Sequence, residues 1–408
     1  GGNLPTTTTV AGVVPKSLTW ETATTYDAGL DLDFFNSRLS FTGDYYIRET
    51  TDMFTVSETL PAVYGASAPR GNNASMETLG WEISLQWRDS FNLADKPFNY
   101  SIKGTLWDSN SYITSYKGNS SNQIVTSLGN LIKKNYAYYE GQHIGDIWGY
   151  TVEGLFLNQE DIDNHAKQTF IQSSDKVQRP GEVKVKDLDG SDEIDYGKFT
   201  LDDHGDLSII GDSTPHYRYG INLSANWSGF GISAFFQGVG KQDWYPGSDA
   251  GYFWGKYGRP FFYFIPSIHK LSNPTVAQLS EDGSELLNPD TAYWPRVSTY
   301  QSNGSTNNRL LQIANTRYMQ SIAYLRLKNL QIDYTFNKKV CDALHISSLK
   351  VYLSCENLFC LTPLHKWGPN LDPEGLGVDT DYSYTSGYQE GNTYPLFKTA
   401  TLGVNLTF

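Results

Sequence analysis

The sequence predicts an all-β protein, an antiparallel transmembrane β-barrel portion of roughly nine strands with long extracellular loops. Three observations predict this fold class. Apolar and polar residues alternate along successive segments, as they do in strands with two different faces. The polar faces carry small uncharged residues and Asp, and aromatic residues gather where short turns begin.

The alternation is clearest at the C-terminal segment 396–408, where Lys398 is the one polar lapse on the apolar face. That face carries Leu396, Ala400, Leu402, Val404, Leu406 and Phe408. Outer-membrane barrel strands have such an apolar face toward lipid and small polar residues toward the lumen. The alternative for this segment alone is the last strand of a soluble β-sandwich.

The same pattern recurs upstream in eight further segments. They are 26–34, 39–48, 79–88, 98–106, 217–227, 230–239, 330–336 and 349–357. One irregularity lies at 324–336, because Leu325 and Leu327 have the opposite parity from Leu330 and Ile332. Either a β-bulge shifts the phase there, or the membrane-embedded part begins only near Leu330.

The composition of the two faces favours a membrane barrel over a sandwich. The polar face of a soluble sheet meets bulk water and is usually rich in Lys and Glu, whereas here it is rich in Gly, Ser, Thr, Asn and Asp. Phe34, Trp87, Phe98, Trp227 and Phe408 end the apolar faces beside the short connections. Aromatic rings settle at the membrane–water boundary, so these residues predict an interfacial girdle.

Connection lengths predict the orientation of the barrel. The short or moderate connections are 35–38, 90–97, 228–230 and 337–347, and the long ones are 49–76, 107–215, 240–321 and 359–395. Bacterial barrels keep short turns in the periplasm and place long loops outside the cell. The long connections are therefore expected to be extracellular.

Composition and motifs exclude several function classes. The net charge of −13 offers no basic patch for nucleic acid. The apolar run 261–265 is far shorter than a membrane-spanning helix requires. The seven histidines show no HExxH or paired spacing, so neither a zinc site nor an enzyme is expected.

Several segments, taken together and in order, resemble the SusC/RagA family of TonB-dependent outer-membrane transporters. They are 18–21, 141–156, 180–195, 210–220, 230–240, 293–296, 324–336, 351–359 and 402–408. The resemblance implies a plugged barrel of about 22 strands, of which residues 1–408 would be the C-terminal part. The family's N-terminal plug domain and TonB-contacting segment are not among these residues. An odd strand count also leaves an unpaired edge, which lipid cannot satisfy, and so predicts a longer barrel.

The resemblance also implies a function, a location and partners. It implies import of oligosaccharides or peptides, energised by TonB, through the outer membrane of a Bacteroidota-type Gram-negative bacterium. A SusD-like surface lipoprotein would cover the barrel as a lid. Two alternatives stay open: a passive porin-like or small structural outer-membrane barrel, and a secreted soluble β-rich glycan-binding protein.

One predicted loop is rich in aromatic residues that could contact cargo or lid. They are Trp244, Tyr245, Tyr252, Phe253, Trp254 and Tyr257. Aromatic faces stack on sugar rings and anchor protein interfaces. The alternative is a loop that packs its own small core.

The acidic segment 187–195 is a candidate calcium loop, with Asp187, Asp189, Ser191 and Asp195 as ligands. It departs from the EF-hand pattern, because Asp192 occupies the turn-glycine position and Lys198 replaces the bidentate Glu. An ordered acidic turn without metal is the alternative, and Ca2+ is the only cofactor that the sequence suggests.

Overall fold

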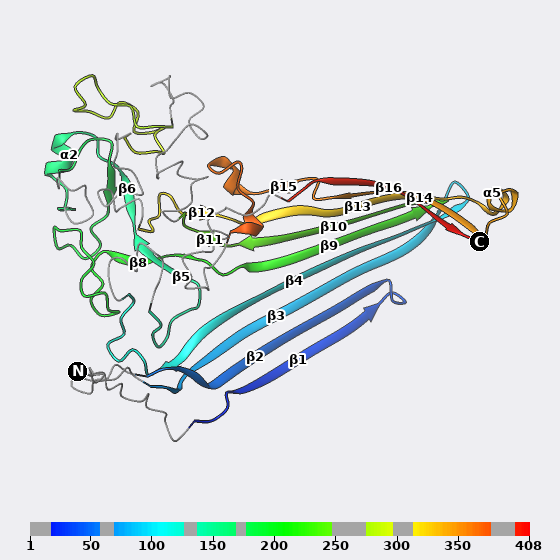
Figure 1. Ribbon diagram of the computed structural model, residues 1–408, viewed down its shortest axis with the longest axis horizontal. Helices are drawn as coiled ribbons and strands as arrows, with labels where there is room; N and C mark the ends of the chain where they lie inside the picture. The colour runs from blue at the N-terminus through cyan, green and yellow to red at the C-terminus, as the bar shows by residue number, and fades with distance from the viewer. Residues whose placement is uncertain are drawn as a thin grey trace, which may run out of the picture.

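The computed structural model describes residues 18–57, 69–125, 137–168, 177–246, 275–296, 313–376 and 396–408. One large antiparallel sheet occupies one end of the molecule, and the long connections lie at the other end (Figure 1). Its main path, which we call the strand wall, has the order β1-β2-β3-β4-β9-β10-β13-β14-β16. These strands are β1 (Thr22–Phe34), β2 (Leu39–Val56), β3 (Arg70–Leu93), β4 (Lys96–Tyr116), β9 (His216–Trp227), β10 (Phe230–Lys241), β13 (Tyr324–Thr335), β14 (Ser348–Glu356) and β16 (Thr399–Thr407).

The predicted fold class and number of strands are therefore confirmed, with corrections to the connections. Strand β4 runs to Tyr116, so the first ten residues of the predicted loop 107–215 are strand, and the predicted connection 90–97 shortens to 94–95. Strands β2 and β3 stay paired as far as Val56 and Arg70, with register shifts on both sides of Met53. Much of the predicted loop 49–76 is thus strand, and the connection is only 57–69. The residues at the ends of β2 and β3 are polar, as loop residues usually are, but their backbone groups pair with the neighbouring strand.

Sharp turns join the strands at one end of the wall. Ala94 and Asp95 have φ values of 50° and 58°, and Ser228 and Gly229 have 51° and 91°. Two successive residues with positive φ form the hairpin turn whose twist matches that of the strands. A third connection at this end contains the short helix α5 (Lys338–Ala343).

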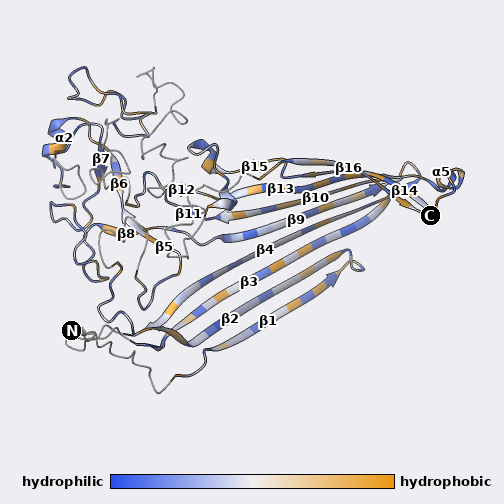
Figure 2. Ribbon diagram, viewed as in Figure 1, coloured by the Kyte–Doolittle hydropathy of each residue, from blue (hydrophilic) through white to orange (hydrophobic). Residues whose placement is uncertain are grey.

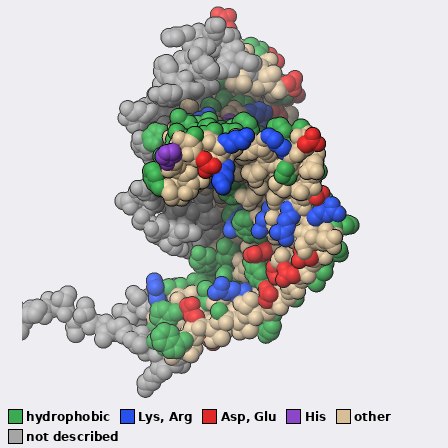
Figure 3. Space-filling model, turned by 90° about the vertical axis from the view of Figure 1, so that its right-hand side faces the viewer, with side chains coloured by type: hydrophobic (Ala, Val, Ile, Leu, Met, Phe, Trp, Pro, Cys, Tyr) green, Lys and Arg blue, Asp and Glu red, His purple; other side chains and the backbone are tan. Residues whose placement is uncertain are grey.

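One face of the strand wall is an uncovered apolar stripe. Cross-strand partners run from Ile232 to Ile332, then to Leu353 and Leu402. Their side chains remain 47, 44, 42 and 74% exposed, although they are aliphatic. A soluble sandwich would bury this face against a second sheet. Orange positions recur along the strands in Figure 2, and Figure 3 shows the described wall as an arc around a hollow.

The predicted aromatic girdle is also present at the short-turn end. The ring of Phe35 lies 6.2 Å from that of Trp87, and Phe230 lies 4.6 Å from Tyr334. The terminal Phe408 is 90% exposed. Large exposed rings in one band are typical of a membrane–water boundary.

The opposite face of the wall is a lattice of polar contacts. Thr42 donates a hydrogen bond to Asp31 at 2.7 Å, and Ser40 donates one to Asp33 at 2.6 Å. Such ladders satisfy the polar side chains within the wall. The structure thus supports a wall-lining role for Asp31 and Asp33.

A β-bulge accounts for the phase irregularity in β13. Phe235 pairs with Asn329, but the next residue, Phe236, pairs with Leu327, so Lys328 is the extra residue. The amide of Asn357 donates to the Lys328 carbonyl at 3.1 Å. Because one residue is inserted, the residues on either side keep a consistent face although their parity differs. Of the two explanations that the sequence left open, the bulge is confirmed.

The long connections fold into a layer at the other end of the wall. This loop layer comprises the described parts of 117–215, 242–323 and 357–398. Its elements are β5 (Asp146–Tyr150), β6 (Val152–Leu155), α2 (Gln159–Asp163), β7 (Val183–Val185), β8 (Leu207–Asp212), β11 (Asp243–Trp244), β12 (Gln320–Ser321), η4 (Pro363–Lys366) and η5 (Pro373–Gly375). The short strand β15 (Cys360–Leu361) pairs with β13 and so belongs to the large sheet. No helix among the described residues is long and apolar enough to span a membrane.

Candidate functional site at the junction of strand wall and loop layer

The loop layer has a hydrophobic core of its own. Tyr293 stacks on Trp367 with ring centroids 3.7 Å apart, and Trp294 stacks on Tyr318 at 5.8 Å. Arg317 donates to the carbonyl oxygens of Tyr293 and Ala292. Burial raises the pKa of the Tyr293 and Tyr318 hydroxyls. The long connections therefore form a packed platform rather than separate loops.

Two of the aromatic residues predicted to contact cargo or lid lie within this core. Trp244 and Tyr245 are 2 and 1% exposed, and Asn315 Nδ2 donates to the Tyr245 hydroxyl at 2.7 Å. Rings buried to this degree offer no free face, which favours packing as their role. Tyr252, Phe253, Trp254 and Tyr257 lie outside the described residues, so their contact role stays a prediction.

The acidic segment 187–195 forms a turn that hydrogen bonds to its own backbone. The Asp187 carboxylate accepts from the amides of Gly190 and Asp192 at 2.7 and 3.0 Å. Slight burial acts to raise the pKa of Asp187, but these backbone hydrogen bonds outweigh it and lower the pKa. Ser191 Oγ donates to the Glu193 carbonyl, so this hydroxyl is engaged within the turn.

The carboxylates that gather beside this turn differ from the predicted set. Oxygens of Asp187, Asp189 and Asp206 lie within 4.8 Å of one another. Asp206 is fully buried, and burial raises its pKa. The Asp195 oxygen instead accepts from the Gly197 amide at 2.8 Å. A calcium ion here stays a prediction, with Asp206 as a ligand that spacing did not identify.

An ion-pair network ties the loop layer to β13. Arg326 is 5% exposed and pairs with Asp372 and Glu374 of the segment around η5. Lys328, the bulge residue, pairs with Glu374 at 2.7 Å. Charges this deeply buried need such pairing, because desolvation is costly.

A histidine–aspartate cluster lies where the loop layer joins β9. His143 comes from the turn before β5, Asp212 ends β8, and His216 begins β9. The two imidazole rings stack with centroids 6.0 Å apart. Asp108 and Asn110 of β4 lie behind them. The spacing of the histidines gave no sign of this cluster. The position of the two histidines in the sequence could have indicated the cluster, because each borders a strand at the end of the wall that carries the long connections.

No family model matches the chain. TonB-dependent receptor P3 of Formosa agariphila is 25% identical over 396 residues, which cover 96% of this chain and 34% of that protein. TonB-dependent receptor SusC of Bacteroides thetaiotaomicron is 25% identical over 184 residues, which cover 45% of this chain and 16% of that protein. Among solved structures, the RagAB peptide importer in its open-open state superposes with a TM-score of 0.61 at 20% identity, over 96% of this chain and 35% of the other. The chain thus spans about a third of the length of the relatives that it matches over almost its whole length.

Proposed function

We propose that this chain, which is similar to TonB-dependent receptors and to the RagAB transporter, forms part of the barrel wall of an outer-membrane transporter of the SusC/RagA kind and serves the energised import of oligosaccharides or peptides. The observation that carries the proposal is the two-faced strand wall. Its apolar stripe is uncovered, as a surface in contact with lipid must be, and its other face is polar and internally hydrogen bonded.

The open edges of the wall support a place within a larger barrel. In the described residues, β1 and β16 end the strand path and are not neighbours of each other. Unpaired backbone groups are very costly in lipid, so both edges need strand partners in the membrane. Further barrel strands would supply those partners.

The loop layer supports a partner on the extracellular side. Its core is packed, and its attachment to β13 is held by buried ion pairs, so it offers a defined surface rather than a set of separate loops. Defined surfaces bind partners at a lower entropic cost than flexible ones do. We assign to it the docking of a SusD-like lipoprotein, with TonB acting through the rest of the transporter.

Uptake by whole cells distinguishes active import from a passive porin. The native strain, a strain lacking the full-length gene and a complemented strain would be given labelled oligosaccharide and peptide pools, with and without a protonophore. Import requires that uptake of one pool depend on the gene and stop when the proton gradient collapses. Gene-dependent uptake that persists under the protonophore would favour the porin, and uptake unaffected by the deletion would contradict both.

Pull-down of the full-length protein in detergent tests the partner. A lipoprotein should co-purify with the wild type, and mass spectrometry would identify it. Recovery of the transporter alone, from cells in which both genes are expressed, would contradict the assignment of a lid.

A further inference from the structure

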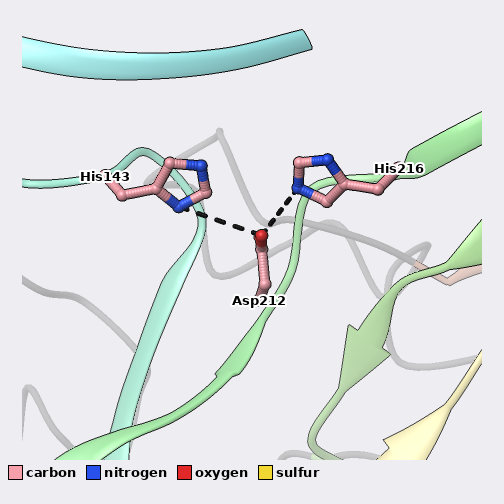
Figure 4. Close-up of side chains that lie close together, drawn as sticks. All are labelled: His143, Asp212 and His216. Carbon is pink, nitrogen blue, oxygen red and sulfur yellow. Dashed lines mark hydrogen bonds and ion pairs between the residues drawn. The ribbon is translucent and has the colours of Figure 1, made fainter. Parts of the chain in front are cut away.

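Three metal-ligating side chains from separate segments converge beside β9 (Figure 4). Asp212 Oδ2 is 2.7 Å from His216 Nε2 and 3.8 Å from His143 Nδ1. All three ligating atoms lie within 4.8 Å of one another. We infer that His143, Asp212 and His216 bind one Zn2+ ion, which fastens the loop layer to the strand wall.

In each ring one nitrogen points away from Asp212, and we call it the outer nitrogen. Both outer nitrogens already have hydrogen-bond partners. His216 Nδ1 lies 2.7 Å from Asp108 Oδ1, and His143 Nε2 lies 3.2 Å from Asn110 Oδ1. These oxygens only accept, so both outer nitrogens carry hydrogen. In neutral imidazoles the inner nitrogens then present lone pairs toward oxygen atoms. His216 Nε2 lies 2.7 Å from Asp212 Oδ2 and 3.0 Å from Thr214 Oγ1, whose hydrogen goes to Asp212 Oδ1. His143 Nδ1 lies 3.3 Å from Asp146 Oδ1 and 3.8 Å from Asp212 Oδ2. Acceptors that face one another need a cation between them, and a metal-ligating histidine usually has such an outer oxygen partner.

The Asp212 carboxylate is held by its Oδ1 atom, which leaves Oδ2 facing the two imidazole rings. Its Oδ1 accepts from the hydroxyl and the amide of Thr214 at 2.6 and 2.9 Å. Gly145 has a φ of +113° and passes so close that a Cβ there would collide with this carboxylate. Oδ2 is therefore the oxygen directed toward the two rings.

The charges of the cluster also call for a cation. Asp108, Asp146 and Asp212 supply three carboxylates, and no Lys or Arg of the described residues forms an ion pair with them. Asp108 and His216 are 6 and 5% exposed. Buried carboxylates without compensation are costly, and a divalent ion would offset most of this charge.

The donor set suits zinc better than calcium or magnesium. The two imidazole nitrogens are borderline ligands that suit zinc, which also accepts a carboxylate oxygen, whereas Ca2+ and Mg2+ prefer oxygen alone. Tetrahedral zinc places its nitrogen and oxygen ligands about 3.3 Å apart. The present separations of 2.7 and 3.8 Å bracket this value, so small side-chain shifts complete the site. Water, or Asp146 beside His143, would supply the fourth ligand.

Metal content of the full-length protein tests the site. Protein with a histidine-free tag would be stripped with chelator, reloaded with Zn2+ and dialysed, and bound metal would be measured by mass spectrometry. His143→Gln and Asp212→Asn should each lose about one ion per chain, or bind it at least 100-fold more weakly. His165→Gln, which removes an imidazole elsewhere in the loop layer, should match the wild type. Asn110→Ala should weaken binding about 10- to 100-fold through the outer contact.

Two further readouts keep the test independent of stability. Co2+ in place of Zn2+ should give tetrahedral absorption bands in folded wild type that are absent in folded His143→Gln. Hydrogen exchange should slow on metal addition in residues 141–150 and 207–216. Equal metal content in wild type, His143→Gln and Asp212→Asn would overturn the site. Binding without slower exchange would overturn the fastening role.

Discussion

Replacing Ile83 by arginine tests whether the apolar stripe faces lipid. Ile83 lies on β3 between Gly43 of β2 and Leu106 of β4, and its side chain is 40% exposed. The adjacent Ser84 points to the other face, between Thr42 and Thr105. An arginine at these two positions therefore meets two different environments at nearly the same depth.

The expected cost follows from depth. Ile83 is two outward-facing positions from the girdle residue Trp87. At about 3.3 Å per residue and a tilt of about 40°, it lies about 10 Å inside the girdle, near the middle of the apolar band. Arginine at that depth costs about 2–4 kcal/mol, whereas on the polar face it should cost less than about 1 kcal/mol.

The assay is denaturant unfolding of the full-length protein in lipid vesicles, followed by tryptophan fluorescence. Ile83→Arg should lower the free energy of unfolding by about 2–4 kcal/mol relative to Ser84→Arg. Equal losses for the two variants, or a larger loss for Ser84→Arg, would refute the assignment of the faces.

Two further changes probe the wall and the loop layer. Gly80→Ala places a Cβ against the Tyr46 ring and should cost about 1–3 kcal/mol, whereas the Cβ of Gly104→Ala meets nothing within 4 Å and should change the unfolding free energy by less than about 0.5 kcal/mol. Equal effects would contradict this packing. The second change concerns the ion pair of Asp161 with Lys184. Burial acts to raise the pKa of Asp161, but the hydrogen bond from Lys184 outweighs it and lowers the pKa. The pair should therefore stabilise the protein above the unfolded-state pKa of about 4, by less than about 1 kcal/mol, and this contribution should fade as pH falls through the lower folded-state pKa. A pH titration of unfolding in which Asp161→Asn leaves this dependence unchanged would contradict it.

The strand wall was predictable because its signal is local. A strand shows its two faces every second residue, so the alternation at 217–227 and 349–357 marks both the strand and its orientation. Even the bulge at Lys328 left a trace, as the change of parity between Leu327 and Leu330. The loop 49–76 was overestimated, because pairing with a neighbour can extend a strand through polar residues.

The loop layer was not predictable in the same way, because its contacts join distant segments without a repeating period. Trp244 in a loop suggests an exposed platform, and only the core around Tyr318 shows that the ring is buried. His143 and His216 belong to different segments and meet only because β4 and β9 are neighbours in the wall. Sequence spacing therefore gave no indication of a zinc site, because the fold brings together two histidines, His143 and His216, that lie far apart in the sequence.

The central claim, that lipid covers the apolar stripe, is tested most directly by spin labels placed in turn at residues 79–87 of a cysteine-free, full-length variant in lipid vesicles. Oxygen, which partitions into lipid, should relax the labels at Trp81, Ile83 and Leu85 most strongly. A water-soluble nickel chelate should instead relax the labels at Glu82, Ser84 and Gln86. This period-two alternation is the predicted result. Uniform accessibility, or labels at Ile83 and Leu85 shielded from both reagents by protein, would contradict the membrane wall.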